Sequence, residues 1–268
     1  MQTIIGFVSD FGLEDAWVGV CHAVIYRACP QARVVDLAHQ IPAFDIRKGA
    51  VVASAGVWQL PDAIHLVVVD PGVGGGRRDL CLVTAGGTVL VGPDNGVLLP
   101  AAWHAGGVAK AYAIDPTKLA SGPPLATFHA RDVLAPAAAA LACGVEPDAL
   151  GEPVDPARLV AAPYERAHGD NGTIVSEVLD VDRFGSLRLG VYAEQFEEFG
   201  LGPGRMEVTL GHLSIKVMFA RTFSDVAVGD PVCMLDSSGL LTLAVRLESA
   251  AERYGVEPGD AVRIHPSA

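Results

Sequence analysis

Strand-like apolar runs alternate with helix-like segments over the first third of the chain, and this alternation constrains the fold most. Ile4–Ser9, Arg33–Leu37 and Ile64–Val69 have the length and composition of strands, and helix-like segments separate them at about 16–28 and 46–59. Apolar strands of this kind need cover on both faces, which is typical of a largely parallel sheet between helices. The sequence therefore predicts an N-terminal α/β domain with a central, mostly parallel sheet.

The chain then changes character. Leu80–Thr84 and Thr88–Val91 are expected to form a strand pair, and the Ala-rich segment Leu134–Cys143 the last long helix of the α/β domain. A loose, Pro- and Ala-rich stretch follows, and beyond it come short strands separated by Gly and Asp, which predict a small β-rich barrel or sandwich. The expected organisation is an α/β domain, a linker and a β domain, at residues 1–160, 161–172 and 173–268.

Composition excludes several classes of partner. The net charge is -12 and no Lys/Arg cluster is present, so a nucleic acid partner is not expected. No apolar stretch reaches the roughly 18–20 residues of a membrane span. The N-terminus lacks the basic region of a signal peptide. The five cysteines are scattered, odd in number and without a CxxC pair, which favours reduced thiols in a cytoplasmic protein and no zinc site.

Four polar clusters follow the expected strands, where ligands of open parallel sheets bind, and a fifth precedes the Ala-rich helix. One cluster alone has a structural explanation, since Asp10 suits the cap of a turn. Five clusters at one sheet edge instead favour a functional site. They are Ser9–Gly12, Asp36–His39, Asp70–Gly74, Gly92–Gly96 and Thr127–Asp132.

Two common site types do not fit these clusters. The glycine-rich run after Asp70 lacks the GxxxxGK[ST] pattern, and no GxGxxG follows the first strand, which argues against phosphate-loop and dinucleotide sites. A divalent metal is disfavoured because the candidate ligands form no HExxH or HxD pair and because Arg77 and Arg78 are expected close to the ion. The candidate ligands are Asp10, Asp36, His39, Asp70, Asp94 and His129. His39, which lies close to Asp36, is interpreted as structural.

In this order, the motifs resemble the adenosine-forming S-adenosyl-L-methionine (SAM) hydrolases, also called SAM hydroxide adenosyltransferases, which are relatives of the fluorinases and chlorinases. Any single motif is weak, but the ordered set is specific and spans nearly the whole chain. The matching stretches are Ser9–Gly12 with Asp15, Ile41–Ile46, Val69–Gly74 with Arg77 and Arg78, Gly92–Gly96, Thr127–Asp132, Asp182–Gly185 and Asp236–Gly239.

The resemblance implies an N-terminal α/β domain, a C-terminal β-barrel domain and a homotrimer. In that arrangement, the substrate SAM lies between the N-terminal domain of one subunit and the C-terminal domain of its neighbour. The implied reaction is hydrolysis of SAM to adenosine and L-methionine, with no cofactor and no metal. The hydrolytic branch of the family carries an Asp, Arg and His set that falls on Asp70, Arg77 and His129, whereas halogenating relatives have uncharged or non-basic residues at the Asp and His positions.

The same resemblance assigns substrate-binding residues. Asp10 would accept hydrogen bonds from both ribose hydroxyls, Phe44 would pack on the ribose and adenine, and Phe128 would line the pocket. Asn95 is also placed among the binding residues.

In the C-terminal half, Asp182 would meet the methionine ammonium and Ser237 the rest of the methionine portion. Two positions depart from the family pattern, since Ser186 and Arg246 each stand where Asn is usual. Ser186 is retained as a binding residue. Both departures bear on affinity more than on the reaction.

The chemistry of the reaction explains the charged set. A sulfonium leaves as neutral methionine, so displacement at the 5′ carbon needs only a well-positioned water. Arg77 would favour hydroxide character, Asp70 would align the water, and His129 is hypothesised to accept the proton. The alternatives are a 5′-halogenase, a non-catalytic sensor of SAM or adenosine, and a metal-dependent hydrolase.

Overall fold

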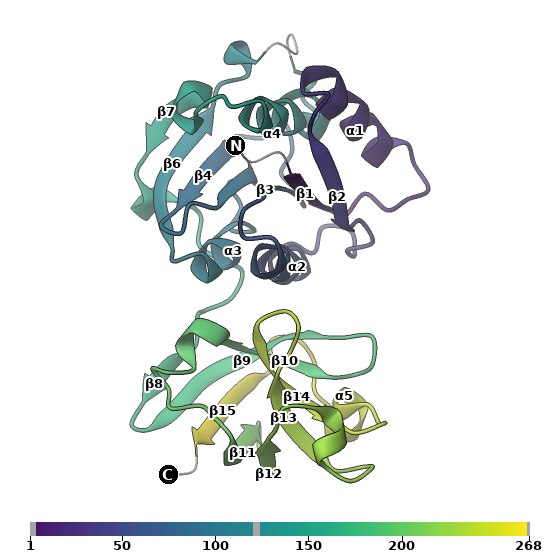
Figure 1. The fold of residues 1–268 in the computed structure, drawn as a ribbon, viewed down its shortest axis with the longest axis vertical. Helices are drawn as coiled ribbons and strands as arrows, with labels where there is room; N and C mark the ends of the chain where they lie inside the picture. The colour runs from purple at the N-terminus through teal and green to yellow at the C-terminus, as the bar shows by residue number, and fades with distance from the viewer. Residues whose placement is uncertain (1–3, 120–123, 267–268) are drawn as a thin grey trace. The chain divides into compact units, whose positions relative to one another are not determined.

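The computed structural model describes residues 4–119 and 124–266 and divides the chain into two compact units, Met1–Pro163 and Tyr164–Ala268. Each unit is built around its own sheet (Figure 1). The α/β and β-barrel fold class expected from the sequence is confirmed. No helix among the described residues is both long enough and apolar enough to cross a bilayer.

The first unit contains a seven-stranded sheet in the order β2-β1-β3-β5-β4-β6-β7. Its first four strands are parallel, and β4, β6 and β7 continue it in antiparallel pairings, so the parallel character covers only part of the sheet. Because β4 is antiparallel to β5, the start of β4 lies at the edge where β5 ends. The strands are β1 (Ile4–Ser9), β2 (Arg33–Ala38), β3 (Ile64–Val68), β4 (Asp79–Thr84), β5 (Val89–Pro93), β6 (Val108–Ile114) and β7 (Gly151–Val154).

Helices cover both faces of this sheet, as its apolar strands require. Helices α1 (Trp17–Ala28) and α4 (Ala135–Ala142) lie on one face, and α2 (Ile46–Gln59) and α3 (Leu99–His104) on the other (Figure 1). A π-helical turn, η2 (Ala130–Leu134), leads directly into α4. The sequence did not predict α3, since six residues are too short to show helical periodicity.

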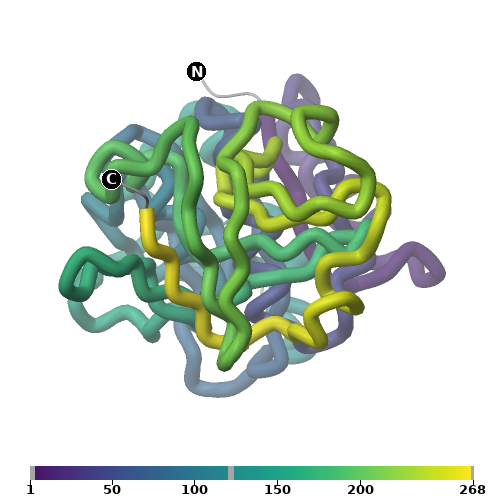
Figure 2. Tube along the Cα trace, turned by 90° about the horizontal axis from the view of Figure 1, so that it is seen from below, coloured from purple at the N-terminus to yellow at the C-terminus, as the bar shows by residue number. Residues whose placement is uncertain are grey.

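The second unit is a barrel of seven strands with one added strand. Strand β10 pairs with both β14 and β9, which closes the order β10-β14-β13-β12-β11-β15-β9, and β8 pairs with the outside of β9. Figure 2 shows β15 in yellow beside the green β11, its antiparallel neighbour. The elements are β8 (His168–Asp170), β9 (Thr173–Val181), β10 (Leu187–Tyr192), β11 (Gly204–Leu210), β12 (Leu213–Phe219), β13 (Pro231–Leu235), β14 (Leu240–Val245), α5 (Ala250–Tyr254) and β15 (Ala261–Pro266).

Two features of this unit differ from the sequence prediction. Of the expected linker 161–172, residues from Tyr164 onward belong to the second unit, where the Tyr164 hydroxyl hydrogen-bonds the Tyr192 hydroxyl at 2.9 Å. Strands β12 and β15 were not predicted, because buried and exposed residues alternate along them and no continuous apolar run marks them.

Candidate active site

A cavity of about 610 Å³ opens in the first unit at the edge where β1 and β3 end. The loop before α2 and the segment before η2 complete its wall. Of the seven sequence-predicted site residues in this unit, five lie on this wall. The lining residues are Asp10, Phe11, Trp17, Ala43, Phe44, Val68, Asp70, Val73, Thr127, Phe128, His129 and Ala130.

Phe44 adopts an unusual backbone conformation beside Asp10. Its φ of 69° lies in the left-handed region, which is uncommon for a bulky residue, and its ring is 71% exposed. The Phe44 amide donates to Oδ2 of Asp10 at 2.9 Å, and Asp45 then caps α2 by accepting from the Lys48 amide at 2.8 Å. Strained, exposed side chains of this kind are found at binding sites. One oxygen of Asp10 holds this loop, and the carboxylate keeps further acceptor capacity for a ligand.

Asp70 and Arg77 form a forked ion pair at the wall of the cavity. Arg77 Nε lies 2.9 Å from each carboxylate oxygen of Asp70, and Nη2 also donates to Oδ2. Burial by itself opposes the charge of Arg77, but the hydrogen bonds and charges of Asp70 and Asp79 outweigh it and raise the pKa of Arg77. The guanidinium is therefore permanently cationic and fixed in orientation.

Asp79, a residue that the sequence prediction missed, joins Arg77 to His129. Its Oδ1 accepts from Arg77 Nη1 at 2.5 Å, and its Oδ2 lies 2.7 Å from His129 Nδ1. The sequence signal was present but indirect: Asp79 opens an apolar strand, directly after two arginines. The three predicted catalytic residues thus belong to one connected set of four side chains.

Aromatic rings form the other side of the cavity. The rings of Phe11 and Phe128 meet edge to face with centroids 5.9 Å apart, and Phe11 meets Trp17 in the same way at 5.9 Å. The guanidinium of Arg131 lies over the Phe128 ring, 5.1 Å from the ring centroid. Phe11 and Trp17 were not predicted as site residues, although Phe11 belongs to the first polar cluster. The cavity therefore has one charged wall and one aromatic wall.

Asn95 does not line the cavity. Its Nδ2 donates to the carbonyl of Val69 at 2.8 Å, and its Oδ1 accepts from the Val97 amide at 3.2 Å. These bonds tie the end of β3 to the turn after β5. Asn95 therefore supports the loop that carries Asp70, through the carbonyl of Val69, the residue before Asp70.

His39 belongs to a separate network behind Asp10. It is 5% exposed, and its ring nitrogens contact Ser9 Oγ at 2.7 Å and Asp36 Oδ1 at 2.9 Å. His22 meets the same Asp36 oxygen at 2.8 Å. Burial opposes the charge of Asp36, but the hydrogen bonds and charges of His39 and His22 together outweigh it and lower the pKa of Asp36. This arrangement resembles a Ser-His-Asp triad in composition, yet Ser9 is fully buried and does not line the cavity.

The predicted residues of the second unit lie in loops at strand ends. Asp182 Oδ1 accepts from the amides of Phe184 and Ser186 at 2.8 and 2.9 Å, which shapes the turn between β9 and β10. Arg188 donates to Asp180 at 2.8 Å and to Asp236 at 3.0 Å, so it links that turn's strands to the loop that carries Ser237. These contacts hold two of the predicted substrate loops in one arrangement.

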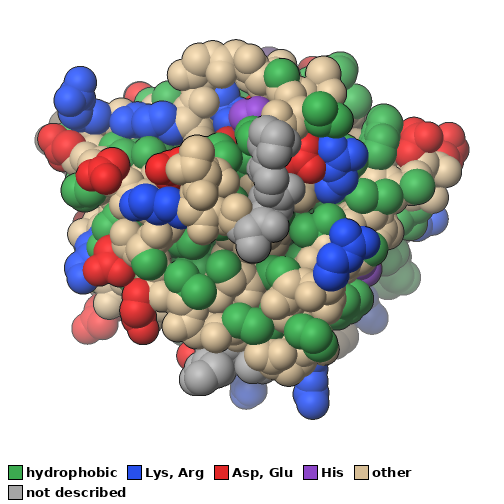
Figure 3. Space-filling model, turned by 90° about the horizontal axis from the view of Figure 1, so that it is seen from above, with side chains coloured by type: hydrophobic (Ala, Val, Ile, Leu, Met, Phe, Trp, Pro, Cys, Tyr) green, Lys and Arg blue, Asp and Glu red, His purple; other side chains and the backbone are tan. Residues whose placement is uncertain are grey.

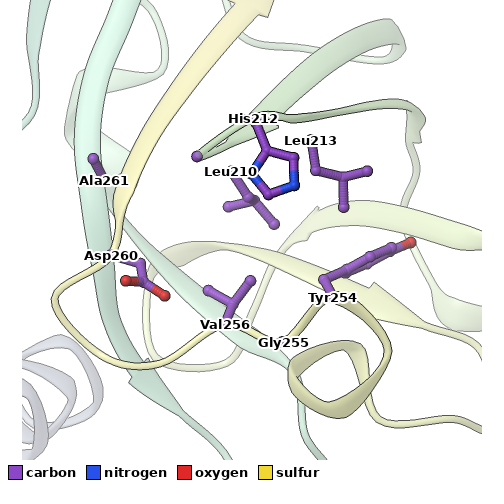
Figure 4. A pocket seen from close by; sticks show the side chains of 9 residues that line it. Leu210, His212, Leu213, Tyr254, Gly255, Val256, Asp260 and Ala261 are labelled. Carbon is purple, nitrogen blue, oxygen red and sulfur yellow. The ribbon is translucent and has the colours of Figure 1, made fainter.

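Arg246, one of the two departures from the family pattern, makes a contact within its own unit. Its Nη1 donates to the carbonyl of Val226 at 2.6 Å. A hollow of about 260 Å³ elsewhere in this unit is lined by His212, Tyr254 and Asp260, with apolar neighbours (Figure 4). None of the sequence-predicted residues lines this hollow.

The charge of the cavity in the first unit favours a cation. Two carboxylates, those of Asp10 and Asp70, line it, and the guanidinium of Arg77 is shared between Asp70 and Asp79. Among the described residues, no group of three or more His, Cys, Asp or Glu side chains is arranged to hold a metal ion. On the face of the molecule in Figure 3, acidic and basic side chains are interspersed without a continuous basic band over its described part.

Both the sequence and the fold of this chain have relatives among known proteins. Residues 5–151 match the family model of the SAM hydroxide adenosyltransferase N-terminal domain, and residues 176–263 match that of the C-terminal domain. An (R)-S-adenosyl-L-methionine hydrolase of Salinispora arenicola is 41% identical over 260 residues, 97% of each chain. A fluorinase of Actinopolyspora mzabensis is 26% identical over 98% of this chain and 97% of its own. The crystal structure of an uncharacterized conserved protein from Thermotoga maritima superposes with a TM-score of 0.86 at 32% identity, covering 98% of this chain and 100% of the other.

Proposed function

The chain belongs to the SAM hydroxide adenosyltransferase family, and from that premise we propose that it is an enzyme that uses water to cleave SAM into adenosine and L-methionine. The observation that carries this proposal is the connected set Asp70–Arg77–Asp79–His129, of which Asp70 and His129 line a cavity that also presents Asp10. Greater similarity to the hydrolase than to the fluorinase supports the choice of water over halide as nucleophile.

The proposed step is an in-line displacement at the ribose 5′ carbon. A C5′–O bond forms as the C5′–S bond breaks, and the electron pair of that bond leaves with the sulfur of neutral methionine. Asp70 and Arg77 position the water, and Arg77 stabilises the charge that develops on its oxygen. His129 accepts the proton. The acidic cavity complements the cationic sulfonium, which needs no acid catalyst in order to leave.

The remaining predicted residues have binding roles in this scheme. Asp10 accepts from the ribose hydroxyls, and Phe44 and Phe128 pack on the nucleoside. Asp182, Ser186 and Ser237 bind the methionine portion, and Asn95 supports the Asp70 loop. No metal or redox cofactor takes part, since both the nucleophile and the leaving group are activated by charge and position alone.

The relatives' name specifies the (R) configuration at sulfur, and we extend this preference to the present chain. The test is chromatography of EDTA-treated protein incubated with both sulfonium epimers of SAM in chloride buffer made with ¹⁸O-water. The expected products are equal amounts of methionine and of adenosine carrying ¹⁸O at the 5′ oxygen, formed from the (R) epimer. Intact SAM in both epimers would indicate a sensor, 5′-chloro-5′-deoxyadenosine a halogenase, and activity abolished by EDTA a metal-dependent hydrolase.

The active unit is proposed to be a homotrimer, with each site completed by the second unit of a neighbouring subunit. The exposed Phe184 and Leu247, large apolar side chains beside Asp182 and Arg246, support contacts of that loop region with a ligand or another chain. Light scattering tests the mass of the assembly. Mixing the inactive variants His129→Ala and Asp182→Ala tests the shared site, because mixed trimers would regain activity while either variant alone would not.

A further inference from the structure

We propose that Asp79 is the positioning residue of this site: it holds His129 as the Nδ1–H tautomer and so leaves Nε2 as the proton acceptor. This inference rests on the proposed hydrolysis and deepens it, because neither the catalytic set expected from the sequence nor any family match assigns a role to Asp79. Its basis is a pair of hydrogen bonds that occupy both oxygens of one buried carboxylate.

The surroundings of Asp79 exclude a direct contact with substrate. Asp79 is 7% exposed and does not line the cavity, whereas His129 does. Oδ1 faces Arg77 Nη1 at 2.5 Å, and Oδ2 faces His129 Nδ1 at 2.7 Å. Asp79 is therefore not a general base, and it acts through the two side chains that it contacts.

The partner of Nδ1 determines the tautomer of His129. An ionised carboxylate only accepts hydrogen bonds, so the proton of a neutral imidazole beside Asp79 must sit on Nδ1. No described group hydrogen-bonds the Nε2 of His129, which leaves that nitrogen's lone pair for a ligand in the cavity. The same carboxylate also stabilises the imidazolium once Nε2 has taken the proton.

Replacing Asp79 by Asn gives a sharp test, because Arg77 dictates how the new amide must sit. A guanidinium only donates, so the oxygen of the new amide has to face Arg77 and its NH₂ group has to face His129 Nδ1. That NH₂ needs an acceptor, which forces the imidazole proton onto Nε2. Nε2 then cannot accept a proton from water, although the shape of the site is preserved.

The experiment compares Asp79→Asn with wild type by steady-state kinetics on SAM and by ¹⁵N NMR of labelled histidine, with His129→Gln used to assign the signal. We expect Asp79→Asn to lower kcat by about 10²–10⁴-fold, the range of general base catalysis, with little change in KM. We also expect the His129 signal to change from the Nδ1–H to the Nε2–H pattern.

Asp94→Asn is the matched control. Asp94 is 5% exposed, accepts from Arg78 Nε at 2.8 Å and from the Val160 amide at 3.0 Å, and touches no cavity residue of the proposed mechanism. This control removes the charge of an equally buried carboxylate, but its partner Arg78 is 36% exposed. We therefore expect it to lose no more stability than Asp79→Asn, to keep kcat within about twofold and to keep the Nδ1–H tautomer.

Several results would overturn the inference. The first is that Asp79→Asn keeps the wild-type kcat. The second is that Asp79→Asn loses kcat while His129 keeps the Nδ1–H tautomer, because the loss would then come from packing. An Nε2–H tautomer in wild type refutes the inference without any variant, which covers the case of a variant that does not fold. Failure of the wild type to hydrolyse SAM would instead contradict the proposed function, and the wild-type spectrum would still report on the hydrogen bond.

Discussion

Replacing Arg77 by Met should destabilise the first unit strongly, because it leaves two buried carboxylates without their shared cation. The side chains of Asp70 and Asp79 are each 6% exposed, and that of Arg77 is 10% exposed. Removing one partner of such a buried pair costs roughly 3–5 kcal/mol. In a unit of this size, each kcal/mol shifts Tm by about 2–4 °C, which gives an expected loss of about 6–20 °C.

Tryptophan fluorescence during urea unfolding can measure this change in one unit alone, since Trp17, Trp58 and Trp103 all lie in the first unit. The informative companion is the triple variant Asp70→Asn, Arg77→Met, Asp79→Asn. An uncharged set of similar shape should recover most of the lost stability, because an intact buried ion pair contributes little net free energy. Activity should stay absent in both variants.

The two measurements separate folding from catalysis. If Arg77→Met unfolds within about 1 kcal/mol of wild type, the carboxylates are less buried or less dependent on Arg77 than the geometry indicates. If the triple variant is as unstable as the single one, shape and packing, rather than uncompensated charge, account for the loss.

Three further predictions concern single positions. Asp10→Asn should lower kcat/KM for SAM by about 10–100-fold through loss of a charged hydrogen-bond acceptor, and a 2′,3′-dideoxy analogue should show no such difference if the ribose is what Asp10 binds. Gly74→Ala should reduce activity, because its Cβ would lie 2.3 Å from the Ala126 carbonyl oxygen, just ahead of the segment that carries His129. The control Gly87→Ala also has a positive φ but meets no atom within 4 Å, so it should cost only about 1–2 kcal/mol of stability and leave activity unchanged. Burial lowers the pKa of His65, so the unfolded chain takes up a proton that the folded unit resists, and stability should fall as pH drops below about 6.5. The pH dependence of urea unfolding should be flatter in His65→Leu, and an equal slope in the two proteins would refute this assignment.

Much of the candidate site follows from one rule about parallel sheets. Asp10 follows β1 directly and Asp70 follows β3 after one residue, and the carboxyl ends of these strands share an edge. Apolar runs followed by acidic residues were therefore enough to place them together. His129 was grouped with the other clusters as part of Thr127–Asp132, but its catalytic role needed the family motifs. Phe44 needed them entirely, because it lies in a segment before a helix that no strand pattern positions.

Asp79 and Trp17 could not be found in this way. Asp79 stands at the beginning of a strand, and only the antiparallel pairing of β4 with β5, which sets Asp79 opposite Pro93, brings it to the edge where the parallel strands end. Trp17 is the first residue of α1, and its position depends on how the preceding loop turns back over Phe11. The position of Asp79 thus depends on strand pairing, and that of Trp17 on the course of a loop. Neither can be read from the local sequence.

The hydrogen bond from the Phe44 amide to Asp10 has a thermodynamic consequence for ligand binding. A ligand that engages the free acceptor positions of Asp10 and packs on Phe44 interacts with both ends of one strained loop. Linkage requires reciprocity. If order in the loop increases the affinity for the ligand, the bound ligand stabilises the left-handed loop by the same free energy. If Asp10 binds the ribose as proposed, ribose binding and order of the Phe44 loop are two expressions of a single coupling energy, transmitted through one carboxylate.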